Sequence, residues 1–386
     1  ASFDGEKFIN QAFEKGAIGA FCTGDNGTLQ VKDTLTAYLQ LANYRRKKLN
    51  FTVVAITGSS GKTTTKELAA SVLSEKFRTF KTPLNHNNEI GFCQTIFEAP
   101  DDTEILVLEM GMRGLGEIEL LSKYAEPDIT IISNVGTAHI GRLGSRENIA
   151  KAKCEIVKYQ RGNIFIAHDD ELIKKTVQFS GKKIFYSIKD VKILEKDTHY
   201  SKFEYYGNIY ELNVGGDYNI ENALSAINTG LALRMKVNEI QSGLKKYAPI
   251  EKRWEAVNAG GFEIINDSYN ANPESMRAFI DTIFELYEKP VVILGDMGEL
   301  GEDEIKYHSE LGKYINSHKN LRQDAEILSI GKLSKYITDG VTNCPAKHFE
   351  TIEQAVDYIK NKDTKVQLFL KASRSMKFER IIEELK

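Results

Sequence analysis

Short runs of apolar, often β-branched residues alternate with longer amphipathic stretches through most of this chain. In the first half the runs lie at residues 51–56, 105–108 and 128–132. A continuous apolar run of this length is typical of a strand that is buried on both faces of a sheet. After the first run, an amphipathic stretch that reaches about Phe77 predicts a helix. Strands that alternate with helices predict a parallel sheet with crossover helices, and therefore the α/β fold class.

The same alternation returns in the last third of the chain. The predicted strands there lie at residues 262–265, 291–294, 327–330 and 366–370, and the predicted helices at 274–287, at 303–318 and at the end of the chain. The helix at 274–287 carries large apolar residues at i, i+3, i+4 and i+7, a spacing that indicates a stripe facing a core. We therefore predict a second, smaller domain that is doubly wound.

The first 50 residues are set apart from these two regions. They end in the basic stretch 44–48, which we expect to be the exposed end of a helix followed by a linker. The sequence starts at Ala1 in a helix-like pattern, and we expect the gene product to begin earlier. The full length of 386 residues, at roughly 150 residues per domain, predicts two or three domains.

Charge and cysteine content exclude several classes of protein. Lys and Arg number 51 against 54 Asp and Glu, which argues against a protein that binds nucleic acid mainly through phosphate attraction. No apolar run approaches the roughly 20 residues that span a bilayer, so we expect no membrane span. The four cysteines form no CxxC pair, which argues against a structural zinc. Sparse, scattered cysteines are typical of the reducing cytoplasm.

The strongest chemical signal is a turn rich in glycine and serine between a strand and a helix. It consists of Thr57, Gly58, Ser59, Ser60, Gly61, Lys62, Thr63 and Thr64. Glycines let the backbone curl around a phosphate with its N–H groups inward, and the helix N-terminus adds positive potential. A lysine there reaches the outer phosphates, and the following Thr63 offers a hydroxyl to Mg²⁺. The full Walker pattern requires glycine where this chain has Ile56, so the match is to a shorter form, and a chance glycine turn is the alternative.

Three further residues follow predicted strands or lie on a predicted helix. Glu109 closes the apolar run at 105–108, which places a carboxylate beside the phosphate loop, where it could bind Mg²⁺. His139 lies just after another strand, and Lys153 lies in a helical pattern. Spacing alone leaves an alternative for each residue. Glu109 could be a solvated glutamate at the end of a strand, His139 a hydrogen-bonded loop histidine and Lys153 a solvated helix lysine.

Nine sequence blocks together resemble the Mur ligase family of ATP-dependent amide-forming ligases. They are residues 57–64, 85–91, 109–113, 134–139, 143–155, 219–222, 267–273, 294–301 and 371–376. Their order and spacing are more specific than any single block. The Tyr-Asn-Ala-Asn-Pro string at 269–273 is most similar to the branch that adds D-alanyl-D-alanine to UDP-N-acetylmuramoyl-tripeptide in peptidoglycan precursor synthesis.

The resemblance implies a three-domain architecture. Residues 1–49 would be part of an N-terminal domain that binds the UDP substrate, residues 50–250 a central P-loop ATPase domain with a parallel sheet, and residues 251–386 a C-terminal Rossmann-like domain. The family's first domain normally carries an Asp-Ser-Arg block and a strand that this sequence lacks. A hinge near 248–252 is expected to swing the last domain onto the central one.

The resemblance also implies roles for individual residues. Contacts to ATP are implied for Gly58, Ser59, Ser60, Gly61, Lys62, Thr63, Thr64, Asn222, Arg253 and Asp267. Two Mg²⁺ sites are implied, one at Thr63 and Glu109 and a second at His139 and Lys153, the lysine being converted by CO₂ into a carbamate. Contacts to the substrates are implied for Asn85, Asn88, Asn270, Asn272, Lys371, Ser373 and Arg374. Lys62, Glu109, His139 and Lys153 form the implied catalytic set. Tyr218 and His168 depart from the family's usual His and Asn.

The resemblance implies a cytoplasmic monomer whose partners are UDP-N-acetylmuramoyl-tripeptide and D-alanyl-D-alanine. Three alternatives remain at this point. The chain could be another ligase of the superfamily, such as a folylpolyglutamate synthase, which would differ around residues 267–273. It could be a non-catalytic relative that binds nucleotide, or a generic P-loop switch protein. ATP turnover that depends on an amine acceptor would separate the enzyme from the other two.

Overall fold

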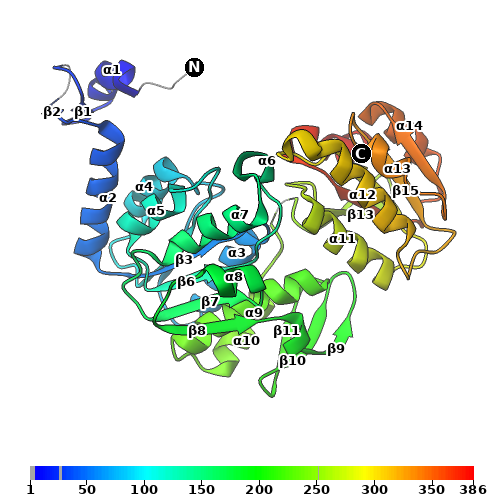
Figure 1. Ribbon diagram of the computed structural model, residues 1–386, viewed down its shortest axis with the longest axis horizontal. Helices are drawn as coiled ribbons and strands as arrows, with labels where there is room; N and C mark the ends of the chain where they lie inside the picture. The colour runs from blue at the N-terminus through cyan, green and yellow to red at the C-terminus, as the bar shows by residue number, and fades with distance from the viewer. Residues whose placement is uncertain (1–4, 26–27, 251) are drawn as a thin grey trace.

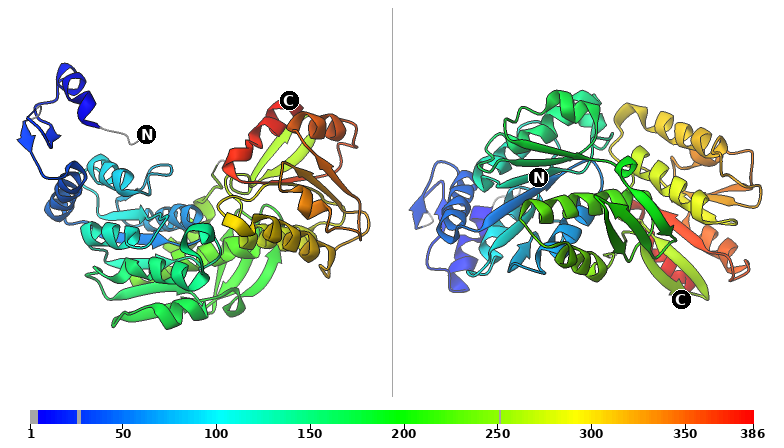
Figure 2. Two further views of the ribbon diagram at one scale, coloured as in Figure 1. Left: turned by 45° about the horizontal axis from the view of Figure 1, so that its top comes forward. Right: turned by 90° about the horizontal axis from the view of Figure 1, so that it is seen from below.

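The computed structural model describes residues 5–25, 28–250 and 252–386. Residues 1–4 and 26–27 of the predicted first domain lie outside the described residues. So does residue 251, which falls in the predicted hinge and begins the predicted last domain. The first elements of the chain and the C-terminal unit lie at opposite ends of a central α/β unit (Figures 1 and 2).

The central unit is built on a six-stranded parallel sheet of order β4-β5-β3-β6-β7-β8. Its strands are β3 (Thr52–Thr57), β4 (Thr79–Lys81), β5 (Ile105–Glu109), β6 (Ile129–Ile132), β7 (Ile164–His168) and β8 (Lys182–Tyr186). Because side chains alternate along a strand, Val54 and Ile56 of β3 face one layer of helices, while Val53 and Ala55 face the other. Both faces are covered, which explains the unbroken apolar runs in the sequence.

Two layers of helices enclose the central sheet. One layer holds α3 (Lys62–Leu73), α9 (Asp217–Ala232) and α10 (Val237–Lys246). The other holds α2 (Thr34–Leu49), α4 (Glu89–Glu98), α5 (Glu117–Ala125), α7 (Arg146–Cys154) and α8 (Glu171–Thr176). The short α6 (Ile140–Leu143) precedes α7. The parallel sheet with crossover helices is confirmed.

A small antiparallel sheet follows the central one and was not expected from the sequence. Its strands, in the order β11-β10-β9, are β9 (Lys192–Lys196), β10 (Ser201–Tyr205) and β11 (Asn208–Leu212). The turn between β10 and β11 contains Gly207 at a φ of 70°. Lys196 of this sheet pairs with Asp217 of α9 at 2.6 Å and with Glu285 of the C-terminal unit at 2.7 Å. The sheet therefore bridges the two larger units.

The C-terminal unit is a second α/β sandwich of strand order β12-β13-β17-β14-β15-β16, in which only β12 is antiparallel. Its strands are β12 (Glu255–Ala259), β13 (Phe262–Asn266), β14 (Val291–Gly295), β15 (Glu326–Ile330), β16 (Ala346–Phe349) and β17 (Leu368–Lys371). Helices α11 (Pro273–Leu286), α12 (Glu304–Asn316) and α13 (Lys335–Thr338) cover one face, and α14 (Ile352–Lys360) and α15 (Glu379–Leu385) the other. The doubly wound fold is confirmed, while the domain boundaries stay predictions.

The first described elements are the 3₁₀ turn η1 (Gly5–Phe8), helix α1 (Ile9–Glu14) and the two-residue strands β1 (Phe21–Cys22) and β2 (Leu29–Gln30), which pair in parallel. Helix α2 then runs down onto the central unit (Figure 1). Among the residues described, no helix combines the length and the apolar character that crossing a membrane requires.

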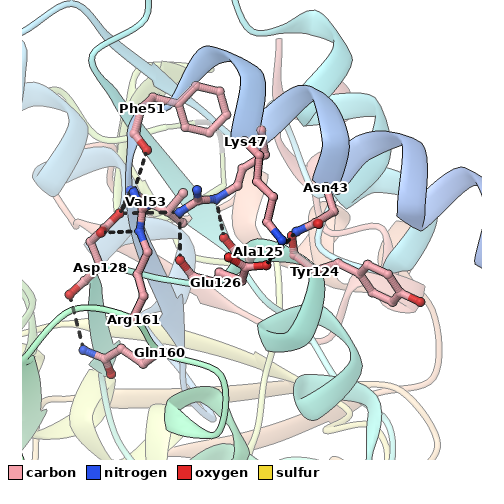
Figure 3. A network of polar contacts seen from close by, with 11 residues as sticks. Asn43, Lys47, Phe51, Val53, Tyr124, Ala125, Glu126, Asp128, Gln160 and Arg161 are labelled. Atoms are coloured by element: carbon pink, nitrogen blue, oxygen red, sulfur yellow. Dashed lines mark hydrogen bonds and ion pairs between the residues drawn. The ribbon is translucent and has the colours of Figure 1, made fainter.

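The basic stretch 44–48 lies at the end of α2 as predicted, and Tyr44, Lys47 and Lys48 are exposed, but the predicted linker is wrong and Arg46 is buried. Only residues 50–51 separate α2 from β3. Arg46 is 1% exposed and donates from Nε to the carbonyl of Ala125 at 2.8 Å and from Nη2 to that of Glu126 at 2.9 Å. These carbonyls end helix α5, and Asn43 and Lys47 bind the same turn from one face of α2 (Figure 3). Burial of the cation is favourable because it completes a helix C-terminus.

Candidate active site

The carboxyl ends of the central strands open into one large cleft that also faces the C-terminal unit. Its volume is about 1010 Å³. Loops after β3, β5 and β6 form one wall, as expected for the carboxyl edge of a parallel sheet. Of the residues predicted from the sequence, those lining the cleft are Ser59, Ser60, Gly61, Lys62, Thr63, Thr64, Asn85, Asn88, Glu109, His139, Asn222, Arg253, Asp267, Asn270, Asn272, Lys371 and Arg374. Gly58, Lys153 and Ser373 are not among the residues that line it.

The glycine-rich turn joins β3 to α3 as predicted. Gly61 has a φ of 73°, and a Cβ there would lie 2.4 Å from Oδ1 of Asn222, so only glycine fits. The Lys62 ammonium donates to the carbonyl of Gly58 at 2.9 Å. Burial lowers the pKa of Lys62, and nearby Arg253 lowers it further, while Glu109 opposes them. The lysine is thus held over the loop, with the N-terminal amides of α3 beneath it.

Asn134, which follows β6, fixes the shape of the phosphate loop. Its Oδ1 accepts the amides of Ser59 at 3.1 Å and Ser60 at 3.0 Å, and its Nδ2 donates to Oγ of Ser60 at 2.8 Å. Ser133 adds a hydrogen bond from Oγ to the carbonyl of Ser60 at 2.6 Å. Our prediction of site residues omitted both, although a polar pair directly after a buried strand is a signal that could have identified them.

Glu109 is only 4% exposed at the end of β5. Its Oε1 accepts Nδ2 of Asn87 at 2.9 Å, whereas its buried Oε2 has no hydrogen bond within the described residues. The nearest cation to Oε2 is Lys66 Nζ at 3.9 Å. A buried carboxylate oxygen without a donor is favourable only beside a cation, so this atom fits a metal ligand. Asn87 and Lys66 were not among the predicted site residues.

His139 lines the same cleft as the phosphate loop, in a left-handed backbone conformation with a φ of 66°. Its Nδ1 is 2.6 Å from Oε2 of Glu299, which belongs to the C-terminal unit. The contact with His139 lowers the pKa of the Glu299 carboxyl. The Thr137 hydroxyl of the same loop donates to Glu274 of α11 at 2.8 Å. The two units therefore meet at the loop that carries the histidine.

Lys153 lies on α7, 1% exposed. Burial shifts its pKa well below the ordinary value, and the positive charge of Lys62 adds to the shift. No described carboxylate forms an ion pair with Lys153 in the structure. The prediction from spacing alone, a solvated helix lysine, is therefore wrong, because this side chain is one of the largest fully buried ones.

The C-terminal unit contributes two cations to the cleft. The Arg253 guanidinium lies 3.9 Å from the centre of the Tyr269 ring, and its Nη2 donates to Oγ1 of Thr63 at 3.0 Å. Lys371 Nζ pairs with Oδ2 of Asp267 at 2.5 Å and is nearly inaccessible to solvent. Arg253 therefore reaches across from the C-terminal unit to the phosphate loop, whereas Lys371 and Asp267 form a pair within it.

Several of the polar side chains predicted to bind substrate also have clear structural partners. The Asn88 side chain accepts the amide of Gly91 and caps α4, and Asn272 accepts that of Ser275 and caps α11. The remaining members of this set make local contacts: Asn270 with the amide of Ala271, Ser373 with Ser375 and Arg374 with Glu379. The Asn85 carbonyl accepts the amide of Asn87, and its side chain has no hydrogen bond to any residue that the structure describes. These local contacts give each of these side chains except that of Asn85 a structural role that does not depend on a bound substrate.

Two residues that depart from the family pattern line the cleft near Asn222. Tyr218 lies edge-on to Trp254, with ring centres 5.7 Å apart. His168 Nε2 is 3.2 Å from Oε1 of Glu221. Burial by itself would lower the pKa of His168, but the Glu221 carboxylate outweighs it and raises that pKa above its ordinary value.

A phosphate-binding loop between β3 and α3, a buried acid without a donor and a second α/β unit facing them define a P-loop nucleotide-binding enzyme made of two apposed units. Comparison with known families narrows this class. Residues 56–230 match the Mur ligase middle domain, and residues 252–374 match the Mur ligase, glutamate ligase domain. The chain belongs to the Mur ligase family of ATP-dependent ligases.

Full-length relatives agree with this assignment. The chain is 36% identical over 411 residues to the UDP-N-acetylmuramoyl-tripeptide--D-alanyl-D-alanine ligase of Bacillus subtilis, covering 99% of this chain and 88% of the relative. A crystal structure of MurF from Acinetobacter baumannii superimposes with a TM-score of 0.87 at 28% identity, covering 99% of this chain and 88% of that one. The Thermotoga maritima MurF in complex with ADP gives 0.86 at 28% identity, covering 99% and 91%. These similarities confirm the three-domain Mur ligase fold expected from the sequence.

Proposed function

We propose that this chain joins D-alanyl-D-alanine to UDP-N-acetylmuramoyl-tripeptide at the expense of ATP, in peptidoglycan precursor synthesis. The observation that carries the proposal is the single cleft of about 1010 Å³ that holds the phosphate loop, Glu109 and His139 on one side and Arg253, Asp267 and Lys371 on the other. The identity of 36% to a ligase with this substrate pair, over 99% of the chain, supports the choice of substrates.

The terminal carboxylate of the tripeptide is a poor acyl donor, so the reaction must first activate it. A carboxylate oxygen of the tripeptide attacks the γ-phosphorus of ATP, and the bond from that phosphorus to the bridging oxygen of ADP breaks. The uncharged amine of D-alanyl-D-alanine then attacks the acyl carbon of the resulting acyl phosphate. The carbon–oxygen bond to phosphate breaks, and the new amide nitrogen loses a proton. The protein's contribution is to hold the reactants together and to neutralise phosphate charge.

Charge neutralisation falls to Lys62, Arg253 and the amides of the first turn of α3. Lys62 is held by the carbonyl of Gly58, a neutral partner that it can leave for a phosphate oxygen. Arg253 is held by the hydroxyl of Thr63, also a neutral partner, and by the Tyr269 ring. Neither cation is paired with a carboxylate in these contacts, so each is available to pair with the polyphosphate.

The donor set in the cleft fits Mg²⁺. Oε2 of Glu109 is buried without a hydrogen bond within the described residues. No group of three His, Cys, Asp or Glu side chains that could hold a metal occurs among the described residues, which agrees with an ion held by one protein carboxylate, a hydroxyl and substrate phosphates. We assign a first ion to Thr63 and Glu109 and a second to His139 and the carbamate of Lys153. When bound, the ions would supply positive charge to the phosphates of ATP.

Formation of the carbamate requires Lys153 to be uncharged. The nitrogen lone pair forms a bond to the carbon of CO₂, and a proton leaves the nitrogen. Burial lowers the pKa of Lys153 well below its ordinary value, which favours the neutral amine. The product carries oxygen ligands and a negative charge next to Lys62, whose positive charge would then stabilise it.

Asp267 and Asn222 are assigned to the nucleoside of ATP, and Asn270, Asn272, Ser373 and Arg374 to the incoming dipeptide and the acyl phosphate. Asn85 and Asn88, on the opposite wall, are assigned to the tripeptide. The domain boundaries near residues 50 and 251, a hinge at 248–252, a monomeric state and a cytoplasmic location complete the proposal.

The decisive experiment measures phosphate release from ATP by this chain with UDP-N-acetylmuramoyl-tripeptide, with D-alanyl-D-alanine added or omitted. Release is expected only when both substrates are present. A second arm replaces the dipeptide by L-glutamate and the muramoyl substrate by a folate. Turnover in that arm alone would assign the chain to a different ligase of the superfamily, and no turnover in either arm would contradict the proposed function.

The carbamate has its own test. Lys153→Ala is expected to lose most activity and to regain part of it with short carboxylic acids, which can supply the missing oxygen ligands. Lys151→Ala, on the exposed side of the same helix, is the matched control and is expected to behave as the unaltered chain. Full activity of Lys153→Ala without added acid would exclude the carbamate.

A further inference from the structure

The loop that carries His139 makes its closest approach to the C-terminal unit at one small contact. Nδ1 of His139 lies 2.6 Å from Oε2 of Glu299, and the Gly141 amide donates to the Glu299 carbonyl at 3.4 Å. The backbones touch beside it, because a Cβ on Gly141 would lie 2.6 Å from the nitrogen of Gly301. One residue of the C-terminal unit therefore engages the histidine loop by both its side chain and its main chain.

Backbone conformation marks the same contact. His139 has a φ of 66° and Glu299 a φ of 61°, so both are non-glycine residues in the left-handed region. Such a conformation costs about 1 kcal/mol or more for each residue and persists where the surroundings hold it in place. Glycine at either position would avoid this strain but would also remove the side chain that makes the contact. The strained backbone at both positions therefore indicates that the orientation of these two side chains is important.

We infer that Glu299 is a positioning residue that holds the His139 imidazole for metal binding, so that docking of the C-terminal unit completes the second metal site. This inference rests on the proposed function, in which His139 is a ligand. An imidazole has two nitrogens, and a carboxylate bound at Nδ1 fixes the tautomer and leaves the lone pair of Nε2 for the metal. Because the carboxylate comes from the other unit, the site depends on closure.

The contact is tested without turnover by hydrogen exchange of the segment 137–141 in protein free of nucleotide and metal. Glu299→Ala is expected to raise the exchange rate of this segment by about tenfold or more, because the docked turn is released. Gly141→Ala inserts a Cβ against Gly301 and is expected to do the same while leaving both side chains intact. Glu302→Gln, an exposed acid three residues further along the chain, is the matched control and is expected to leave exchange unchanged.

The positioning role is tested by the Mg²⁺ dependence of phosphate release. Loss of a partner to a metal-binding histidine typically costs 10- to 100-fold in metal affinity or activity, so the half-saturating Mg²⁺ concentration should rise by about that factor in Glu299→Ala. Glu299→Gln keeps an acceptor for Nδ1–H and should fall between it and the unaltered chain. KM for D-alanyl-D-alanine should change by less than about twofold.

The outcomes separate this inference from the function on which it rests. An active Glu299→Ala with the same Mg²⁺ dependence as Glu302→Gln overturns the positioning role, even if exchange rises. Unchanged exchange in both Glu299→Ala and Gly141→Ala overturns the contact itself. An unaltered chain that releases no phosphate with both substrates overturns the proposed function and the metal role together.

Discussion

Replacement of Arg46 by Met tests how helix α2 is attached to the central unit. The guanidinium of Arg46 completes the C-terminus of α5 through the carbonyls of Ala125 and Glu126, at 2.8 and 2.9 Å. Asp128, 3.8 Å away, keeps two hydrogen bonds from Arg161 when Arg46 is removed. The substitution therefore leaves two backbone acceptors without donors but creates no unpaired buried charge.

The magnitude follows from these two bonds. A hydrogen bond to a charged group contributes about 1.5–3 kcal/mol, so the pair contributes roughly 3–6 kcal/mol. The bond to the carbonyl of Glu126 is only partly buried, and water can replace part of it, which favours the lower end of that range. Met retains most of the apolar contact of the arginine stem. We expect Arg46→Met to lower the free energy of unfolding by about 3 kcal/mol.

The assay is urea unfolding followed by far-ultraviolet circular dichroism, with the midpoint and slope compared between variants. Lys48→Met is the matched control, because Lys48 lies on the same helix turn but is exposed, and its effect should stay within about 0.5 kcal/mol.

Helix α2 also carries Leu35 into the wall of the cleft, so Arg46→Met should raise KM for the muramoyl-tripeptide more than KM for ATP. A difference below about 1 kcal/mol between the two variants would refute the assigned role of the buried guanidinium.

Three further predictions concern the nucleotide side of the cleft. Binding of ADP is expected to change the fluorescence of Trp254, the only tryptophan, since its buried ring lies in the lining of the cleft; an unchanged spectrum at saturation would contradict this placement. In Gly61→Ala, the same titration should give an affinity lowered by about tenfold or more, because a Cβ would meet Asn222 at 2.4 Å in a left-handed backbone, and equal affinity would contradict it. Glu221 raises the pKa of His168 in the folded chain, so the unaltered chain should be more stable than His168→Gln below pH 6.5 and lose this advantage as the pH rises beyond that value. A difference in urea midpoint between the two proteins that stays constant from pH 6 to 8 would exclude the effect.

Local patterns in the sequence predicted three strands of the central sheet, four strands of the C-terminal sheet, the phosphate loop and the position of Glu109, because each depends on residues close together in the chain. The partners that shape the site could not be predicted in this way. Asn134 fixes the phosphate loop from about 75 residues away. Glu299 reaches His139 from another unit. Such contacts depend on the order of strands and on the docking of two sheets, and neither leaves a periodic signal in the sequence.

Two arginines near the end of α2 show the same limit of prediction from local sequence. A run of basic residues is usually solvated, and the solvated state was the expectation for residues 44–48. Arg45 instead donates to the carbonyls of Ile96 and Ala99 at the end of α4, and Arg46 to those at the end of α5. Two helix C-termini lie side by side against α2, and each offers carbonyls that need donors. The requirement arises only once the helices are packed, so it is invisible in the composition of the stretch.

Three of the lysines of the central and C-terminal units show how different surroundings give one type of side chain different chemistry. Lys371 is paired with Asp267 at 2.5 Å, so its charge is balanced and its position is fixed. Lys62 is held by a neutral carbonyl, which it can leave to pair with a phosphate. Lys153 forms no ion pair with any described residue and lies near Lys62, so its pKa falls and the neutral amine is favoured. The surroundings, rather than the residue type, thus separate a fixed charge, an available cation and, under the proposed function, an amine that reacts with CO₂.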